Sequence, residues 1–357
     1  MNAPAKEYDG IHKYIRITDI DEQTSAYKQD DVVSPDAELE EKYKVKENDI
    51  LFARTGASTG KSYLYDINDG VLYYAGFLIR GNVKIDNNAK FVFLQTKTSN
   101  YKNWVGIMSA RSGQPGINSQ EYSSYRFRIP SKAEQNKIAQ VFSLIDNRIQ
   151  TQIGAIEDYK KLKGYLIDEL IEQRGRTMKI GDVIAQRTER NRKNDDYTVL
   201  SVNNQKGFIA QSEQFEEREV ASEDKSNYKI VRRDDFAYNP ARINVGSIAR
   251  LSNYDCGIVS PMYICFHSDE RVLPEFLGYF FESRYFATEV DKRLEGSVRL
   301  CLSYDGLCDI SIQIPNVENQ QAIIQKLDAV SQKIALEEQC LDLFKQQKAY
   351  LLKNMFV

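Results

Sequence analysis

The sequence predicts an α+β protein in which one unit is used twice. We expect two pseudo-symmetric globular domains, separated by two long helices that pack as an antiparallel coiled coil. Three observations predict this: the 357-residue chain matches itself at an offset of 185 residues, β-type alternation fills the first ~130 residues of each copy, and apolar heptads fill the last ~40. The expected boundaries are 1–131 and 173–316 for the globular domains and 132–172 and 317–357 for the helices.

The repeat is the strongest of these observations. The offset holds from residue 14 to residue 172, with apolar positions in register, which chance similarity rarely produces over such a length. The matched segments are Tyr14–Asp19 with Val199–Asn204, Asp49 with Asp234, Ala75–Ile79 with Ser260–Ile264, Arg126–Pro130 with Ser311–Pro315, and Gln135 with Gln320. Because there are two long copies and not many short ones, a solenoid is excluded.

Each copy changes from a strand pattern to a helix pattern just after a proline, Pro130 or Pro315. Strand signals before this point include Asp49–Ala53 and Val259–Phe266. Forty helical residues extend ~60 Å at 1.5 Å per residue, so each helix needs a long partner, and the other copy's helix is available. Matching interruptions of the two heptad patterns favour antiparallel pairing, with parallel pairing left as the alternative. The expected seam residues are Phe142, Ile145, Ile149, Ile156 and Leu166 in copy one and Leu327, Val330, Ile334, Leu341 and Leu351 in copy two.

The composition is that of a globular protein: 42% hydrophobic and 28% charged residues, with a formal net charge of −3. No window approaches the ~18 consecutive apolar residues of a membrane helix, and the polar N-terminal residues lack a signal-peptide core. Five cysteines without CxxC spacing and two histidines disfavour a disulfide framework, a zinc site and a histidine-based hydrolase. We therefore expect a cytoplasmic protein with no membrane partner and no metal site.

Two motifs resemble catalytic signatures but depart from them. Gly56–Ser62 is similar to a phosphate-binding loop, yet it has three residues where that loop needs four before Gly-Lys-Ser. An enzyme that hydrolyses nucleotides with Lys61 is therefore kept only as an alternative. Asn239-Pro240 is similar to the Asn-Pro-Pro-aromatic motif of amino-methyltransferases, but Ala241 and Arg242 replace its last two residues. We expect no catalytic residues in this chain.

The small net charge hides a strong local asymmetry. Residues 1–41 carry −7, residues 42–131 carry +7, and residues 173–193 carry +5. The basic stretch 42–131 is interleaved with Trp104 and the seven tyrosines between residues 63 and 125, a pattern that favours phosphate contacts and base reading. The alternative is that acidic and basic segments neutralise each other. Two loops, Arg111–Asn118 and Leu294–Leu300, are candidate base readers or ordinary surface turns. The expected DNA-contacting residues are Arg54, Lys61, Arg80, Arg111, Gln114 and Asn118 in copy one and Arg242, Asn244, Arg299 and Tyr304 in copy two.

The whole chain resembles the specificity subunit of type I restriction-modification systems. The segments that carry the resemblance are Met178–Ile184, Tyr197–Val202, Tyr228–Asn239 and Gly257–Pro261 in copy two, Asp49–Gly56 in copy one, and in both copies Ile-Pro before a Gln-rich helix start. The resemblance implies that each globular domain is a target recognition domain that reads half of a split site in double-stranded DNA, with the helices as a ruler. It also implies two modification (methyltransferase) subunits and restriction/translocase subunits as partners, on which S-adenosylmethionine and ATP/Mg would bind, this chain having no cofactor of its own.

One departure concerns the start of copy one. At an offset of 185, the counterpart of Met178–Ile184 falls before Met1, so we expect the first domain to lack this opening segment or to receive it differently. An alternative function of another class is a coiled-coil adaptor whose globular domains bind proteins and never DNA.

Overall fold

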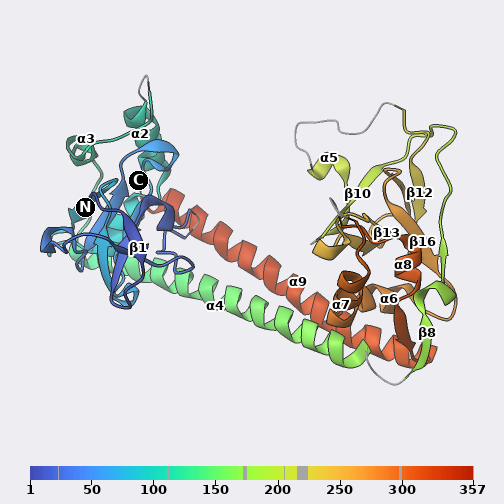
Figure 1. Ribbon diagram of the computed structural model, residues 1–357. Coiled ribbons are helices and arrows are strands. Elements are labelled where there is room, and N and C mark those ends of the chain that lie inside the picture. The colour runs from blue at the N-terminus through green and yellow to red at the C-terminus, as the bar shows by residue number, and fades with distance from the viewer. Residues whose placement is uncertain are drawn as a thin grey trace. The chain divides into compact units, whose positions relative to one another are not determined.

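The computed structural model describes residues 1–22, 24–110, 113–171, 175–204, 206–214, 224–296 and 300–356. The chain forms two compact units. Unit 1 comprises Met1–Ile153 and Gln339–Val357, and unit 2 comprises Gly154–Glu338 (Figure 1). Each long helix is therefore divided between the two units.

Unit 1 is built from small sheets and three short helices. The sheets pair β1 (Ala5–Glu7) with β3 (Val33–Pro35), β2 (His12–Ile15) in parallel with β6 (Val71–Tyr74), and β5 (Ser62–Leu64), β4 (Asp49–Ala53) and β7 (Leu78–Asn82) in the order β5-β4-β7. The helices are α1 (Ala89–Gln95), α2 (Ser99–Ser109) and α3 (Ser119–Ser124). Alternating apolar residues of these strands, among them Ile15, Leu51 and Leu72, are fully buried in a common core, as the strand pattern requires.

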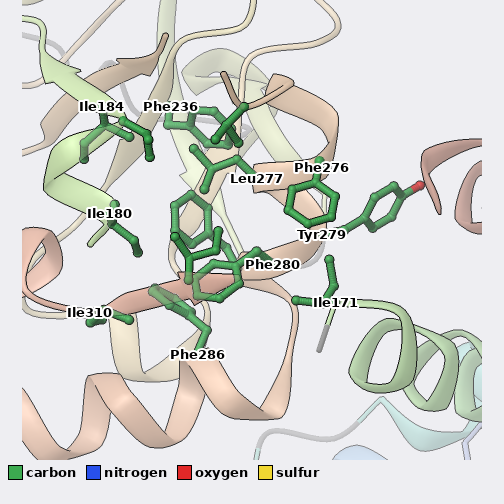
Figure 2. Close-up of a cluster of buried hydrophobic side chains, with 14 of the residues drawn as sticks. Ile171, Ile180, Ile184, Phe236, Phe276, Leu277, Tyr279, Phe280, Phe286 and Ile310 are labelled. Carbon is green, nitrogen blue, oxygen red and sulfur yellow. The ribbon is translucent and has the colours of Figure 1, made fainter. Parts of the chain in front are cut away.

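Unit 2 repeats this construction with longer sheets. One four-stranded sheet has the order β11 (Gly207–Ala210), β10 (Val199–Asn203), β15 (Cys256–Val259), β12 (Lys229–Arg232). A second four-stranded sheet has the order β14 (Ile248–Arg250), β13 (Phe236–Tyr238), β16 (Ile264–Ser268), β9 (Ile184–Gln186). A third sheet pairs β17 (Ser311–Ile314) with β8 (Arg176–Lys179), and the helices are α5 (Gln211–Gln214), α6 (Pro274–Phe281), α7 (Arg284–Arg293) and α8 (Tyr304–Cys308). The largest hydrophobic core lies between α6, α7 and these strands (Figure 2).

The structure confirms the duplicated α+β fold. At an offset of 185 residues, β6 falls on β15, α1 on α6, α2 on α7 and α3 on α8. At β4 and β13 the offset between equivalent residues is 186 and not 185. Asn48 and Asp234, just before these strands, both have a left-handed backbone, with φ of 65° and 69°. Asp49 accepts a hydrogen bond from the Lys46 N–H and Asp235 from the Arg232 N–H, both at 2.7 Å. The expected match of Asp49 with Asp234 is therefore wrong, because the equivalent carboxylate belongs to Asp235.

The long helices are α4 (Lys132–Ile171) and α9 (Val317–Asn354), and they run antiparallel in both units (Figure 1). In unit 1, Asp146 of α4 bonds Lys348 at 2.6 Å, whereas Phe142, one turn earlier, contacts Phe356 beyond the end of α9, with ring centroids 5.7 Å apart. In unit 2, Lys160 bonds Glu338 at 2.7 Å, whereas the end of α4 packs near the start of α9. The antiparallel arrangement that the heptads favoured is confirmed.

The expected seam residues lie on the inner faces of these helices to different depths. Phe142, Ile149, Ile156, Leu327 and Ile334 are buried, and Ile145, Leu166, Val330, Leu341 and Leu351 are half-buried. Lys163 takes the place of an apolar residue in the heptad pattern of α4. Its ammonium bonds Glu282 at 2.8 Å and lies 5.2 Å from the centre of the Tyr279 ring. The helix leaves the heptad here because it packs against the globular domain of copy two.

Candidate nucleic-acid interface

The same two loops meet in both units. In unit 1, the loop after β4 receives hydrogen bonds from the loop before α3: Ile117 N–H donates to the Arg54 carbonyl at 2.9 Å. In unit 2, Leu302 N–H, from the loop before α8, donates to the Pro240 carbonyl after β13 at 3.1 Å. Ile117 and Leu302 are 185 residues apart, so the repeat places one pair of loops at equivalent positions of the two units. Both loops suggested as base readers belong to these pairs.

In unit 1, this loop pair presents the exposed side chains of Arg54 and Gln114. Gly56, with φ of +75°, starts a tight turn and donates to the Pro115 carbonyl at 2.9 Å. A Cβ at this glycine would lie 3.1 Å from Gln114 Nε2, so the residue also lets the two loops approach closely. Arginine and glutamine carry the paired donors and acceptors that match guanine and adenine edges in the major groove.

Tyrosine side chains hold the β4 loop in place. The Tyr122 hydroxyl donates to the Ala53 carbonyl at 2.7 Å and accepts from the Gly60 N–H at 3.2 Å, and the Tyr101 hydroxyl donates to the Gly60 carbonyl at 3.1 Å. Burial raises the pKa of Tyr122 to about 12, so this hydroxyl stays protonated at neutral pH. Tyr101 is buried, and its ring centroid lies 5.9 Å from that of Trp104. These aromatic residues, which the sequence offered as base-reading candidates, support the loop.

Three other side chains of unit 1 that were expected to contact DNA make bonds within the protein. Lys61 Nζ lies 2.6 Å from Glu22, Arg80 donates to the Lys44 carbonyl at 3.0 Å, and the Asn118 side chain caps α3. Arg111 lies outside the described residues. Because Lys61 leads into strand β5 and not into a helix, its loop lacks the helix N-terminus that phosphate-binding loops use.

In unit 2, the turn between β13 and β14 presents Arg242 and Asn244, both exposed. Arg242 lines a hollow of about 650 Å³ together with Asn239, Gln211 and apolar side chains. Tyr304 is half-buried against the main core, and burial, followed by the nearby Cys308, raises its pKa. Arg299 lies outside the described residues.

Two polar residues of this hollow were missed at the sequence level. Asn239 directly precedes Pro240, which the equivalent hydrogen bonds make the counterpart of Arg54, so the repeat indicates this loop but not Asn239 itself. Gln211 has no such signal, yet its Oε1 is buried without a hydrogen-bond partner among the residues that the structure describes. A buried acceptor of this kind costs free energy unless a ligand or water bonds it.

The described ranges contain no cluster of three or more His, Cys, Asp or Glu side chains that could hold a metal ion. Their five cysteines are all free thiols. Among the helices of these same ranges, none has the length and apolar character needed to cross a membrane.

Known families and structures resemble this arrangement over the full chain. The crystal structure of the type I restriction-modification system S subunit from M. genitalium has the same fold, with a TM-score of 0.58 and 14% identity over 100% of this chain and 93% of that chain. A chain from a structure on complex assembly and conformational transition of the type I R-M system gives a TM-score of 0.61 and 14% identity over 95% and 90% of the two chains. The family model of the type I restriction modification DNA specificity domain matches residues 2–157 and again residues 176–345. The chain therefore belongs to the type I restriction-modification DNA specificity family and carries its domain twice.

Proposed function

We propose that this protein is the DNA-recognition subunit of a type I restriction-modification complex and that each of its units reads one half of a bipartite site. The observation that carries the proposal is the loop pair found at equivalent positions of both units, with Arg54 and Gln114 exposed in one and Arg242 and Asn244 in the other. These side chains match base edges, whereas the basic stretch 42–131 supplies charge for sequence-independent phosphate contacts.

We further propose that the long helices bind two modification subunits. Leu343 and Tyr350 are exposed on α9 and are spaced by seven residues, so they lie on one face of the helix. Leu144 is exposed on α4 of the same unit. Apolar side chains at heptad spacing outside an existing seam fit further helices of a partner protein.

In this proposal the chain itself is not catalytic and acts in the cytoplasm, where its DNA lies. S-adenosylmethionine would bind on the modification subunits, and ATP/Mg on restriction/translocase subunits. Membership of the specificity family supports this division of labour, as does the likeness to a chain of a type I R-M assembly.

The test is methylation-site sequencing in cells that express this chain with its modification subunits. We expect a two-part motif with an unspecified spacer. Arg54→Ala and Gln114→Ala should relax base preference in one half of the motif, and Arg242→Ala and Asn244→Ala in the other half, by ~1–3 kcal/mol per lost base contact. The exposed Lys84→Ala is the matched control and should leave both halves unchanged.

Two alternatives predict other results. The adaptor hypothesis predicts no salt-dependent DNA binding even with modification subunits present, and that outcome would overturn the proposal. The nucleotide-hydrolase hypothesis predicts ATP binding that is lost in Lys61→Ala.

A further inference from the structure

In unit 2, one continuous segment closes two sheets. Residues 176–179 form β8, which pairs antiparallel with β17, and residues 184–186 form β9, which pairs with β16. Between them, the Ile180 N–H donates to the Ile310 carbonyl at 2.8 Å. The segment 176–186 therefore uses its main chain to cover the edges of two sheets.

The same segment also fills the core of unit 2. Ile180, Val183 and Ile184 are buried members of the core cluster that also contains Phe276, and Figure 2 shows Ile180 and Ile184 at one side of this cluster. The same cluster contains residues of α6, of β17 and the position before it, and of the long helices, namely Phe276, Phe280, Ile310, Ile312, Ile323 and Ile171.

In unit 1, the equivalent place is a hollow of about 770 Å³. Its lining residues Phe91, Phe127, Ile138 and Phe356 are, at the 185-residue offset, the counterparts of Phe276, Ile312, Ile323 and Ile171. Residues 126–129, the counterpart of β17, are not in a strand, and β7, the counterpart of β16, pairs only with β4 among the described strands.

The exposure of equivalent side chains shows the difference. Ile129 is 51% exposed, whereas its counterpart Ile314 is 7% exposed beneath β8. An extended partner segment can add a strand along main chain that is uncovered in this way.

The charge around the hollow indicates what kind of strand fits. In unit 2, Ser311 and Gln313 lie opposite Lys179 and Thr177. In unit 1, the same two positions are Arg126 and Arg128, both exposed. Directly opposite residues in an antiparallel pair interact, so two acidic side chains fit here and a lysine does not.

We propose that the hollow of unit 1 is a docking site for an extended, acidic segment of a partner protein. The segment adds a strand along residues 126–129, places carboxylates opposite Arg126 and Arg128, and inserts aliphatic side chains as Ile180, Val183 and Ile184 do in unit 2. A second copy of this chain is a poor occupant, because withdrawing its own residues 176–186 would uncover as much apolar surface as it covers.

The test uses the full chain and synthetic peptides based on residues 175–187. The acidic probe carries Thr177→Glu and Lys179→Glu, and the control probe adds Ile180→Asp, Val183→Asp and Ile184→Asp to these changes. We expect the acidic probe to bind with 1:1 stoichiometry, at least tenfold more tightly than the unchanged sequence, and to protect the amides of residues 126–129 from hydrogen exchange. The control probe should not bind.

A charge reversal on the protein makes the test independent of peptide solubility. Both arginines are exposed, so the double variant Arg126→Glu, Arg128→Glu should fold and should prefer the unchanged, lysine-bearing peptide. Each of three results would overturn the proposal: the acidic probe shows no saturable binding, the control probe with three aspartates still binds, or the double arginine variant keeps the parent's preference for the acidic probe. Protection of residues 126–129 that depends on the concentration of the chain alone would assign the site to a second copy and would overturn it too.

Discussion

Gln135 and Gln320, 185 residues apart, make the same pair of hydrogen bonds in their two units. The Oε1 atoms accept from the N–H of Asn88 and of Leu273, at 2.9 and 2.8 Å, and the Nε2 atoms donate to the carbonyl of the proline before each long helix, at 3.0 and 2.9 Å. Both side chains are buried, with exposures of 2% and 0%. Because Asn88 and Leu273 are the N-cap residues of α1 and α6, each glutamine ties the start of a long helix to its globular domain.

Replacing either glutamine by methionine should therefore destabilise its unit. Gln320→Met leaves a buried N–H and a buried carbonyl without partners, which costs ~1–3 kcal/mol for each unsatisfied group. Urea unfolding should show the loss, and Gln135→Met should show a loss of similar size in unit 1. The neighbouring Gln321 is exposed, and Gln321→Met should stay within ~0.5 kcal/mol of the parent. An equal effect at Gln321 would contradict the role given to the hydrogen bonds.

The paired carboxylates Asp49 and Asp235 should differ in importance. Both are buried, but Asp235 lies 2.7 Å from Arg187 Nε, whereas Asp49 accepts from the neutral Asn82 amide at 2.8 Å. Asp235→Ala leaves a mostly buried guanidinium without its partner and should cost ~3–5 kcal/mol. Asp49→Ala should cost ~1–3 kcal/mol, since the donors that lose a hydrogen bond are neutral and its charged neighbour, Arg80 Nε, lies 3.9 Å away.

Denaturant unfolding of the two variants measures this difference. The double variant Asp235→Ala, Arg187→Met is the control. It also removes the unpaired guanidinium charge, so it should recover part of the free energy of unfolding that Asp235→Ala loses. If the double variant is as unstable as Asp235→Ala, the ion pair is not the cause.

Lys97 should make the stability of unit 1 depend on pH. Its ammonium donates to the hydroxyls of Ser25 and Ser62 at 2.6 and 2.7 Å, and burial, followed by the nearby lysines, lowers its pKa from 10.5 to about 7. Between pH 7 and 10.5 the unfolded chain thus binds more protons at this site than the folded chain, so the free energy of unfolding should rise with pH in this window. Below pH 7 both states are protonated and the slope should vanish.

Urea unfolding at several pH values between 7 and 10.5 tests this dependence. Lys97→Met should remove the rise, whereas Lys84→Met, at an exposed position, should retain it. A parent protein whose stability is flat over this window would show that Lys97 keeps an ordinary pKa.

The sequence alone predicts most of the fold, because its signals are periodic and repeated. Heptads in two copies indicate the long helices, and the 185-residue offset pairs Gln135 with Gln320 from the sequence alone. The short helices of the globular domains, such as α1 and α6, were not predicted, because β-type alternation was expected there. The one-residue slip at Asn48 and Asp234 was not foreseen, since a single left-handed residue leaves no mark on a hydropathy pattern.

The candidate site was less predictable than the fold. The sequence says which polar groups a side chain carries, but it does not say whether these groups face solvent or bond within the protein. Arg80 carries the same guanidinium as Arg54, but it lies on β7, where the Lys44 carbonyl accepts its hydrogen bond. Tyr101 and Tyr122 have aromatic faces suited to bases, yet their hydroxyls reach loop backbone and their rings are packed. Of the described candidates, Arg54 and Gln114 in unit 1 and Arg242 and Asn244 in unit 2 remain on the surface of the loop pairs.

The ion pair between Lys61 and Glu22 leads to the last prediction. The lysine follows the β4 loop of the candidate interface, and its ammonium lies 2.6 Å from the carboxylate of Glu22, whose pKa the lysine lowers. Glu22→Gln removes the competing negative charge, so Lys61 becomes available to a DNA phosphate. Binding to a mixed duplex should then strengthen, and the slope of log Kd against log salt should increase by about one unit. Fluorescence anisotropy at 50–200 mM salt measures both, and the added Lys61→Ala change should cancel the gain. If Glu22→Gln leaves affinity and slope unchanged, Lys61 does not contact DNA.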